Sequence, residues 1–200
     1  MSRGPDPPPT PDPPSPPFET GPPEHVHALG VVSLMFNQLE GVLLALHRLY
    51  FGWDSSLPLK LFDSAKNNMR TEILLALAEG KEKRTEVREL LANFIEGFVI
   101  CAENRNLLLH SVLRRMTVEP DYMPMVKRST HDPTKATTYL YTLEDIRRVA
   151  NDMHRFERLG ADVFMNVMFT DYPRAGAYFV PLPSRLASPR KLAERVRRSP

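Results

Sequence analysis

Residues Ala102–Ser111 read Ala-Glu-Asn-Arg-Asn-Leu-Leu-Leu-His-Ser and lie within a long helical pattern. Apolar residues precede this stretch at alternating spacings of four and three, which is the spacing of one buried helix face: Val87, Leu91, Phe94, Phe98 and Cys101. Arg105 occupies the next position of that face. Because an unpaired buried charge is costly, this arginine must either have a partner or lie at an open cleft.

Helical periodicity extends on both sides of this stretch and predicts four helices, over about residues 25–50, 56–80, 85–116 and 142–169. The second helix is predicted to begin at Ser56 and to end at Gly80. Its predicted buried face consists of Leu59, Phe62, Met69, Ile73 and Leu77. The fourth helix is predicted to be capped by Thr142, with Asp145 in the capping-box position.

Between the third and fourth helices the apolar period changes to that of strands. Residues 125–128 and 137–141 flank a turn-like His131–Thr134, which predicts a β-hairpin. The sequence therefore predicts an all-α fold: an up-and-down bundle of four long helices with a small β-hairpin before the last helix.

The two ends of the chain differ from its middle in composition. Residues 1–24 hold eleven of the twenty prolines and are acidic, so we expect a disordered proline-rich arm. Residues 170–200 carry seven basic and two acidic side chains, which predicts a basic, largely disordered tail. Residues 25–169 are expected to form one helical domain.

Composition also excludes several classes of site. One cysteine permits neither an internal disulfide nor a four-thiolate zinc site. We find no apolar run of membrane-spanning length and no signal-like segment, which predicts a cytoplasmic protein with no membrane partner. No nucleotide-binding or zinc-protease motif is present, so we expect no cofactor and no metal. His25-x-His27 could bind a metal but lacks a third ligand nearby, and a solvated loop is the simpler interpretation.

The polar residues of the opening stretch are a candidate site. Asn106 and His110 are four residues apart and share one helix face, whereas Arg105 lies about 140° from His110 at 100° per residue. Either the long arginine side chain bends toward the histidine, or two copies of the helix meet and pool these groups. Histidine can move a proton and arginine can hold a phosphate. A purely structural alternative pairs Arg105 with Glu40 or Glu103.

Arg105–Ser111 resembles the Arg-x4–6-His signature of HEPN domains, including the polar residue that often follows the arginine. The first predicted helix contains Phe36–Gly41, which is similar to the first helix of several bacterial HEPN families. The resemblance covers residues 25–169. It implies a helical bundle, usually a homodimer, and in active members RNA cleavage by Arg and His from both subunits. Many members serve in toxin–antitoxin, phage-defence or RNA-processing systems, and others are non-catalytic.

These observations lead to one functional hypothesis and one alternative. We expect a HEPN-like, metal-independent endoribonuclease acting as a homodimer on RNA, with an antitoxin-type protein as a further partner. Arg105 would hold the scissile phosphate, His110 would act as general acid and base, and Asn106, the third residue of the catalytic set, would orient the histidine or the phosphate. Glu40 and Glu103 are candidate second-layer partners of this set. The alternative is a non-catalytic HEPN-like module that binds a protein, a nucleotide or RNA through the same residues.

Overall fold

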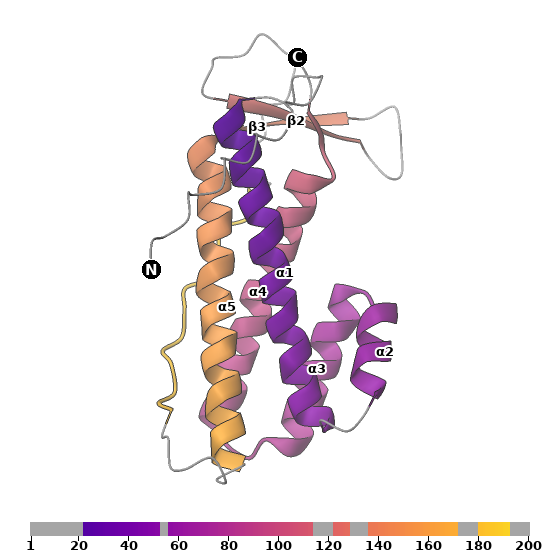
Figure 1. Cartoon of the computed structure of the whole chain (residues 1–200), viewed down its shortest axis with the longest axis vertical. Coiled ribbons are helices and arrows are strands. Elements are labelled where there is room, and N and C mark those ends of the chain that lie inside the picture. Colours follow the sequence, from indigo (N-terminus) through magenta and orange to yellow (C-terminus); the bar gives the residue numbers. More distant parts are fainter. Residues whose placement is uncertain (1–21, 53–55, 114–121, 129–135, 172–179, 193–200) are drawn as a thin grey trace, which may run out of the picture.

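The computed structural model describes residues 22–52, 56–113, 122–128, 136–171 and 180–192 (Figure 1). In these ranges the chain is mostly helical, with a small antiparallel sheet before the last helix. The elements in chain order are α1 (Pro23–Phe51), α2 (Leu57–Ser64), α3 (Asn67–Lys81), α4 (Thr85–Leu109), β1 (Val112–Leu113), β2 (Tyr122–Arg128), β3 (Ala136–Thr142) and α5 (Leu143–Asp171). The predicted helical class and the hairpin before the last helix are confirmed.

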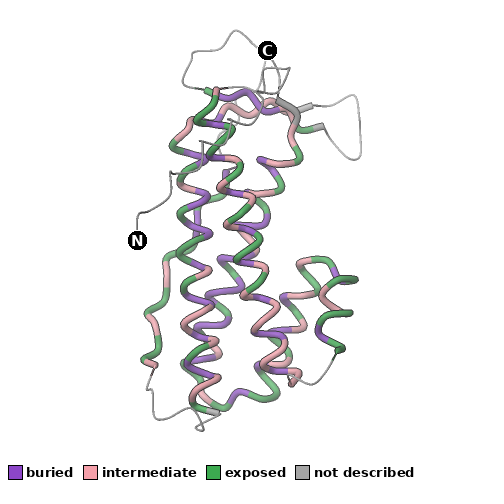
Figure 2. Tube along the Cα trace, viewed as in Figure 1, coloured by how far each residue is buried: buried purple, intermediate pink, exposed green. Residues whose placement is uncertain are grey.

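Three long helices, α1, α4 and α5, lie side by side and enclose the core (Figure 1). Figure 2 shows buried residues recurring along each of them, while α2 at the edge is largely exposed. The apolar face predicted on the third helix is confirmed, since every member from Val87 to Cys101 is almost fully buried. Periodicity read from the sequence is therefore sufficient to orient α4 in the bundle.

Two glycines allow α4 and α5 to approach each other closely. A Cβ atom on Gly97 of α4 would lie 2.1 Å from Cε1 of Phe156, a ring carried by α5. A Cβ atom on Gly160 of α5 would lie 2.5 Å from Cε2 of Phe94, a ring carried by α4. Each helix thus receives an aromatic ring of the other at a position where only glycine fits, which fixes how the two helices face each other.

The predicted second helix is wrong in one respect, because it is two helices. The chain leaves the helix after Ser64, and Ala65 has an extended backbone with ψ of 146°. Ser64 donates its hydroxyl proton to the Lys60 and Leu61 carbonyls, a local bond that competes with helix continuation. The break also resets the buried face. The predicted Leu59 and Met69 are 43% and 55% exposed, whereas α3 buries Thr71, Leu74 and Ala78.

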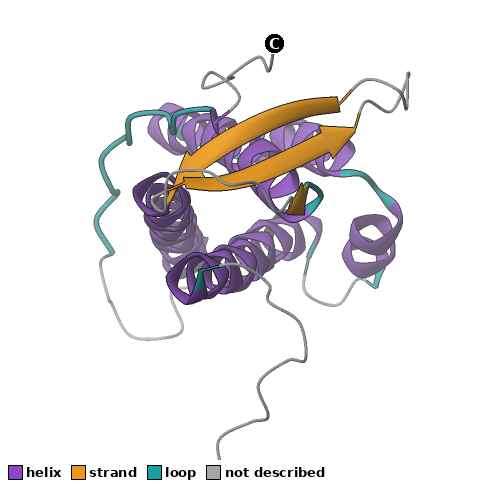
Figure 3. Cartoon of the chain, turned by 90° about the horizontal axis from the view of Figure 1, so that it is seen from above, coloured by secondary structure: helices purple, strands orange, loops and turns teal. Residues whose placement is uncertain are grey.

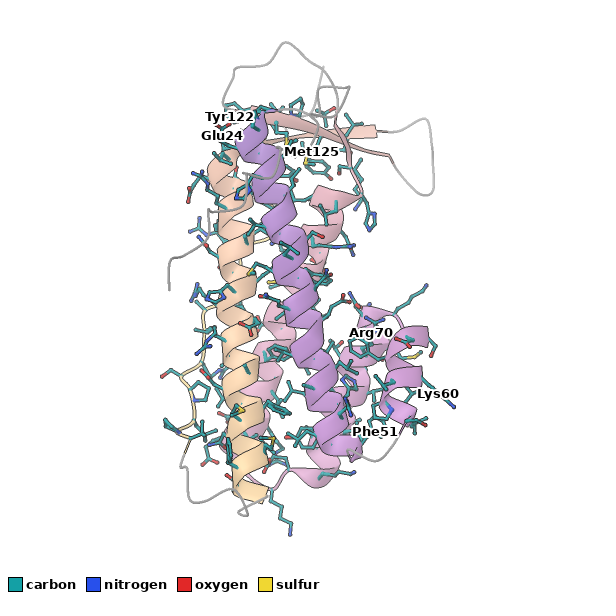
Figure 4. All side chains as sticks on the ribbon, in the orientation of Figure 1. Glu24, Phe51, Lys60, Arg70, Tyr122 and Met125 are labelled. Carbon is teal, nitrogen blue, oxygen red and sulfur yellow. The ribbon has the colours of Figure 1, made fainter. Side chains whose placement is uncertain are left out.

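Polar contacts attach α3 to α1. Arg70 of α3 forms an ion pair of 3.0 Å with Glu40 of α1, and its guanidinium lies 4.0 Å from the centroid of the Phe62 ring. Figure 4 shows Arg70 on the side of α3 that faces α1. His47 of α1 is buried, with one ring nitrogen 2.8 Å from the Leu43 oxygen and the other 2.8 Å from the Arg70 oxygen. Burial lowers the pKa of His47, although both carbonyl contacts oppose that effect.

The sheet lies across one end of the long helices (Figure 3). Strands β2 and β3 are antiparallel with Met125 opposite Tyr139, and β1 pairs with the other edge of β2. Met125 is buried between the sheet and the helix ends (Figure 4). The third helix is therefore shorter than predicted. It ends at Leu109 instead of residue 116, because Val112 and Leu113 pair with β2 as β1.

Helix α5 begins directly after β3 with the predicted capping box. The Asp145 N–H donates to Thr142 Oγ1 at 3.1 Å, and Asp145 Oδ2 accepts from the Thr142 N–H at 3.2 Å. The reciprocal pair satisfies two backbone donors that the helix itself leaves without partners. The predicted cap is confirmed, although aspartate takes the place of the usual glutamate or glutamine.

The prediction of a largely disordered C-terminal tail is wrong for residues 180–192. This stretch, which we call the C-terminal segment, runs beside α5 (Figure 1) and hydrogen-bonds to Asn93, Asn104 and Asn166. Leu192 is only 2% exposed. The hydrogen-bond partners of the C-terminal segment lie on helices far from it in the sequence, which is why local composition did not predict that the segment is ordered. Helix α1 begins at Pro23, close to the predicted domain start, and the rest of the proline-rich arm lies outside the described residues.

Helix α1 contradicts the expectation that no apolar run reaches membrane-spanning length. Its 29 residues include a window with a mean hydropathy of 1.7, which is long and apolar enough to cross a membrane. The same residues pack against α4 and α5, and a buried core helix has such a composition too. The expected cytoplasmic location stays a prediction.

Candidate functional site

The polar residues predicted as a site come together at the C-terminal end of α4. The Nη1 atom of Arg105 lies 3.1 Å from Oδ1 of Asn106 and 3.1 Å from Nε2 of His110. His110 is the C-cap residue that directly follows α4, and its N–H donates to the Asn106 carbonyl at 3.1 Å. Of the two routes considered from the sequence, the arginine side chain reaches the histidine within one chain. The 140° offset is thus bridged by the length of that side chain.

The contact between arginine and histidine permits only one direction of hydrogen bonding. A guanidinium carries only donors, so Arg105 must donate to Nε2 of His110. Nε2 then holds its lone pair, and the proton of a neutral imidazole resides on Nδ1. Asn106 uses its carbonyl oxygen in the same set, which leaves its NH2 group available. His110 and Asn106 are both exposed, so a ligand can reach them from solvent.

Arg105 lies at the edge of the core and not inside it. Its guanidinium lies 5.4 Å from the centroid of the Phe36 ring of α1, and its side chain is partly buried. Its Nε atom is buried and makes no hydrogen bond within the described residues. The core position that the sequence assigned to Arg105 belongs instead to Asn104, which is 2% exposed. Arg105 is therefore an interface residue between the core and solvent.

Neither predicted second-layer carboxylate contacts the set. Glu40 pairs with Arg70 at 3.0 Å, and Glu103 pairs with Lys191 at 2.7 Å. The prediction that Glu40 and Glu103 support the Arg105, Asn106 and His110 set is therefore wrong. The structural alternative, in which a glutamate neutralises Arg105, is wrong for the same reason: each carboxylate has its own cation.

The other polar candidates lie away from this set. Within the described residues no group of three or more His, Cys, Asp or Glu side chains could hold a metal ion. His25 is buried, contrary to the expected solvated loop, and neither ring nitrogen has a hydrogen-bond partner there. His27 lines a separate pocket of about 510 Å³ between α1 and α5, together with Glu24 and Arg147. Burial raises the pKa of the Cys101 thiol to about 12, so it is no nucleophile near neutral pH.

Sequence reasoning missed the asparagines that bind the C-terminal segment. Asn93 and Asn104 are 3% and 2% exposed, and Asn166 is 7% exposed. A signal was available, because Asn93 and Asn104 directly adjoin the predicted apolar face of α4. Side-chain amides beside a buried face require hydrogen-bond partners, so these asparagines predict a neighbouring segment whose backbone supplies them.

The chain matches no protein-family model, no curated protein and no solved structure, so its function has to be inferred from the residues described above.

Proposed function

We propose that this protein is a HEPN-like, metal-independent endoribonuclease in which Arg105 and His110 are catalytic and Asn106 orients them. One observation supports the proposal: Arg105 Nη1 lies 3.1 Å from both Asn106 Oδ1 and His110 Nε2 at a solvent-exposed helix end. In this proposal α1, α3, α4 and α5 correspond to the four helices of the bundle, and α2 is an addition to it.

The chemistry uses a histidine beside a cation. In this mechanism the Nη1–H of Arg105 turns from His110 Nε2 to the phosphate, and the Nε2 atom that it leaves accepts the 2′-hydroxyl proton of a ribose. The 2′-oxygen then forms a bond to the adjacent phosphorus as the bond to the 5′-oxygen breaks. The products are a 2′,3′-cyclic phosphate and a 5′-hydroxyl. Arg105 donates its remaining N–H groups to the non-bridging oxygens, whose charge increases in the transition state.

A homodimer would supply the proton that the leaving group needs. One neutral histidine can accept a proton, but the departing 5′-oxygen must receive one. His110 of a partner subunit, in its protonated form, is the donor that the resemblance implies. Exposure of His110 and Asn106 leaves this end of α4 accessible to RNA and to a second copy. An antitoxin-type partner would bind over the same exposed end.

The test is cleavage of total RNA by the full-length protein in the presence of EDTA. The parent protein should cleave, and its fragments should accept phosphate from polynucleotide kinase without prior phosphatase treatment, because they carry 5′-hydroxyl ends. His110→Ala should reduce the rate by about 10²–10⁴-fold. His154→Ala is the matched control, since His154 is an exposed histidine on α5 outside the set. No cleavage by the parent, or equal cleavage by His110→Ala, would reject the proposal.

The non-catalytic module is the second candidate, and one observation favours it. Arg105 and the NH2 group of Asn106 both carry donors suited to a phosphate, while a single described chain offers only one histidine there. Such a module would bind a fluorescent RNA oligonucleotide and leave it intact. Anisotropy together with gel analysis of the same sample separates the two functions, because only the enzyme shortens the probe.

A further inference from the structure

The face of α4 and α5 that carries three buried asparagines binds the backbone of the C-terminal segment. We call Asn93, Asn104 and Asn166 the asparagine face. Asn93 Nδ2 donates to the Leu186 carbonyl at 3.0 Å, and Asn93 Oδ1 accepts from the Leu186 N–H at 2.8 Å. One carboxamide therefore satisfies both backbone groups of a single residue. This bidentate pattern contacts only the backbone of the polypeptide, and a preference for leucine arises from the packing of Leu186 against the core.

The other two asparagines repeat this mode of contact along the C-terminal segment. Asn104 donates to the Arg190 carbonyl and accepts from the Leu192 N–H, both at 2.9 Å. Asn166 of α5 donates to the Val180 carbonyl at 2.6 Å. Residues 180–191 form neither helix nor strand, so these amides take the place of secondary-structure partners.

The spacing of the asparagines matches an extended chain. Asn93 and Asn104 are three helical turns apart, about 16 Å along α4 at 1.5 Å per residue. Their partners, Leu186 and the stretch centred on Lys191, are five residues apart, which is about 16 Å at the rise of a polyproline-type chain. Both asparagines can therefore bind at once without strain in either partner. Prolines within the segment restrict it to extended backbone before it binds.

Side-chain contacts add a charge preference. Glu89, Glu96 and Glu103 recur every seven residues on α4 and are exposed. Glu96 accepts from the Ser188 hydroxyl at 2.6 Å, and Glu103 pairs with Lys191 at 2.7 Å. The segment itself is basic. These glutamates along α4 therefore favour a ligand that carries basic residues beside aliphatic residues such as Leu186 and Leu192.

We propose that the asparagine face is a binding site for an extended, basic, proline-containing polypeptide, and that residues 180–192 are its exchangeable ligand within the same chain. The site takes a peptide with a bidentately bound residue, as at Leu186, and a second aliphatic residue six positions later, as at Leu192. A free peptide with this pattern displaces the C-terminal segment. The inference is independent of the proposed ribonuclease, because Asn104 lies on another side of α4 from Arg105.

The competing segment decides how the experiment is arranged. A tethered segment acts at an effective concentration on the order of 1 mM, so a peptide that binds the vacant face with a Kd of about 10 µM should be weakened about 100-fold in the parent protein. Substitutions Ser188→Glu and Lys191→Glu in the full-length chain weaken the tethered segment by placing acids against Glu96 and Glu103. Both positions are exposed, so the core is unaffected.

The probe is a fluorescein-labelled synthetic peptide with the sequence of residues 180–192, followed by anisotropy. It should bind the Ser188→Glu/Lys191→Glu protein at least 10-fold more tightly than the parent. Adding Asn93→Ala or Asn104→Ala should weaken that binding at least 10-fold, whereas Asn151→Ala, an exposed α5 asparagine, should not change it. A peptide with Leu186→Asp should bind no better than a scrambled one. Raising salt from 50 to 500 mM should weaken binding several-fold.

Three results would overturn the proposal. The first is absence of peptide binding to a charge-reversed protein whose circular dichroism is that of the parent. The second is binding that Asn93→Ala and Asn104→Ala leave unchanged. The third is unfolding of the charge-reversed protein, which would make the segment an inseparable part of the core instead of a ligand.

Discussion

Replacing Arg105 by leucine separates a catalytic arginine from a structural one. The change removes the contact with Phe36, in which the guanidinium lies 5.4 Å from the ring centroid, a loss of about 0.5–1 kcal/mol. It also removes two exposed hydrogen bonds, each worth about 0.5 kcal/mol at a site open to water. In return it eliminates the buried Nε that has no partner in the described chain, a group that costs about 1–3 kcal/mol.

These terms nearly cancel, and leucine and arginine have similar helix propensities. We therefore expect Arg105→Leu to change the free energy of unfolding by no more than about 1 kcal/mol, which is a shift in Tm of about 2–4 °C for a chain of this size. If the proposed function is right, RNA cleavage should fall by about 10²–10³-fold, because the proposed donor to the phosphate is lost. Thermal melts by circular dichroism and initial cleavage rates measure the two effects on the same sample.

Arg88→Leu is the control on the same helix, since the Arg88 side chain hydrogen-bonds only to Thr85 within the described residues. It should leave both readouts unchanged. Parent-level cleavage by Arg105→Leu would refute the catalytic role of the arginine. A Tm loss above about 10 °C would show that the arginine stabilises the fold, and the near-cancellation worked out above would be wrong.

Three further predictions concern the fold. Gly160→Ala should destabilise the protein by about 1–3 kcal/mol because its Cβ would lie 2.5 Å from the Phe94 ring. Gly30→Ala, in open space on α1, should instead stabilise the protein by about 0.5–1 kcal/mol. Chemical denaturation measures both changes, and equal effects would contradict the packing of α4 on α5. Asn104→Ala should lower Tm by several degrees, since two backbone hydrogen bonds of 2.9 Å are lost, while Asn151→Ala should not; equal Tm values would mean that the C-terminal segment adds no stability. At pH 8 Cys101 should react with a thiol reagent only after unfolding, because burial raises its pKa to about 12; rapid labelling of folded protein would show that this end of the core opens.

Much of the helical fold is predictable from the sequence because its causes are local. The apolar face from Val87 to Cys101 is set by spacing alone, and the Thr142–Asp145 cap needs only residues three apart. The prediction of one continuous second helix was wrong because the cause of its break is not contained in the apolar spacing. Phe62 and Met69 of its predicted face are seven residues apart, which is two turns of one continuous helix. The break between them accompanies the Ser64 hydroxyl bonds and the ion pair of Arg70 with Glu40. The spacing of apolar residues therefore does not reveal where a helix breaks and its buried face changes.

The sequence predicted which residues form the candidate site, but not which residues surround them. Arg105, Asn106 and His110 are close in sequence, so their convergence depends on one helix end and one flexible side chain. The partners of Glu40 and Glu103 could not be predicted in the same way. Glu103 pairs with Lys191, which is 88 positions away in a segment whose composition suggested disorder. Contacts of that range are decided by the folded backbone.

The choice between Asn104 and Arg105 shows why the site holds a cation that no carboxylate among the described residues neutralises. From Cys101, residue 104 lies about 60° to one side of the apolar face and residue 105 about 40° to the other, so spacing alone permits either to be buried. Burial of the arginine would require a carboxylate, and the two that the sequence suggested are paired with Arg70 and Lys191. An asparagine requires only peptide groups, which the C-terminal segment provides at 2.9 Å. Asn104 is therefore buried, and because Arg105 follows it directly, the guanidinium is left beside His110 at the surface, where it can meet an anionic ligand.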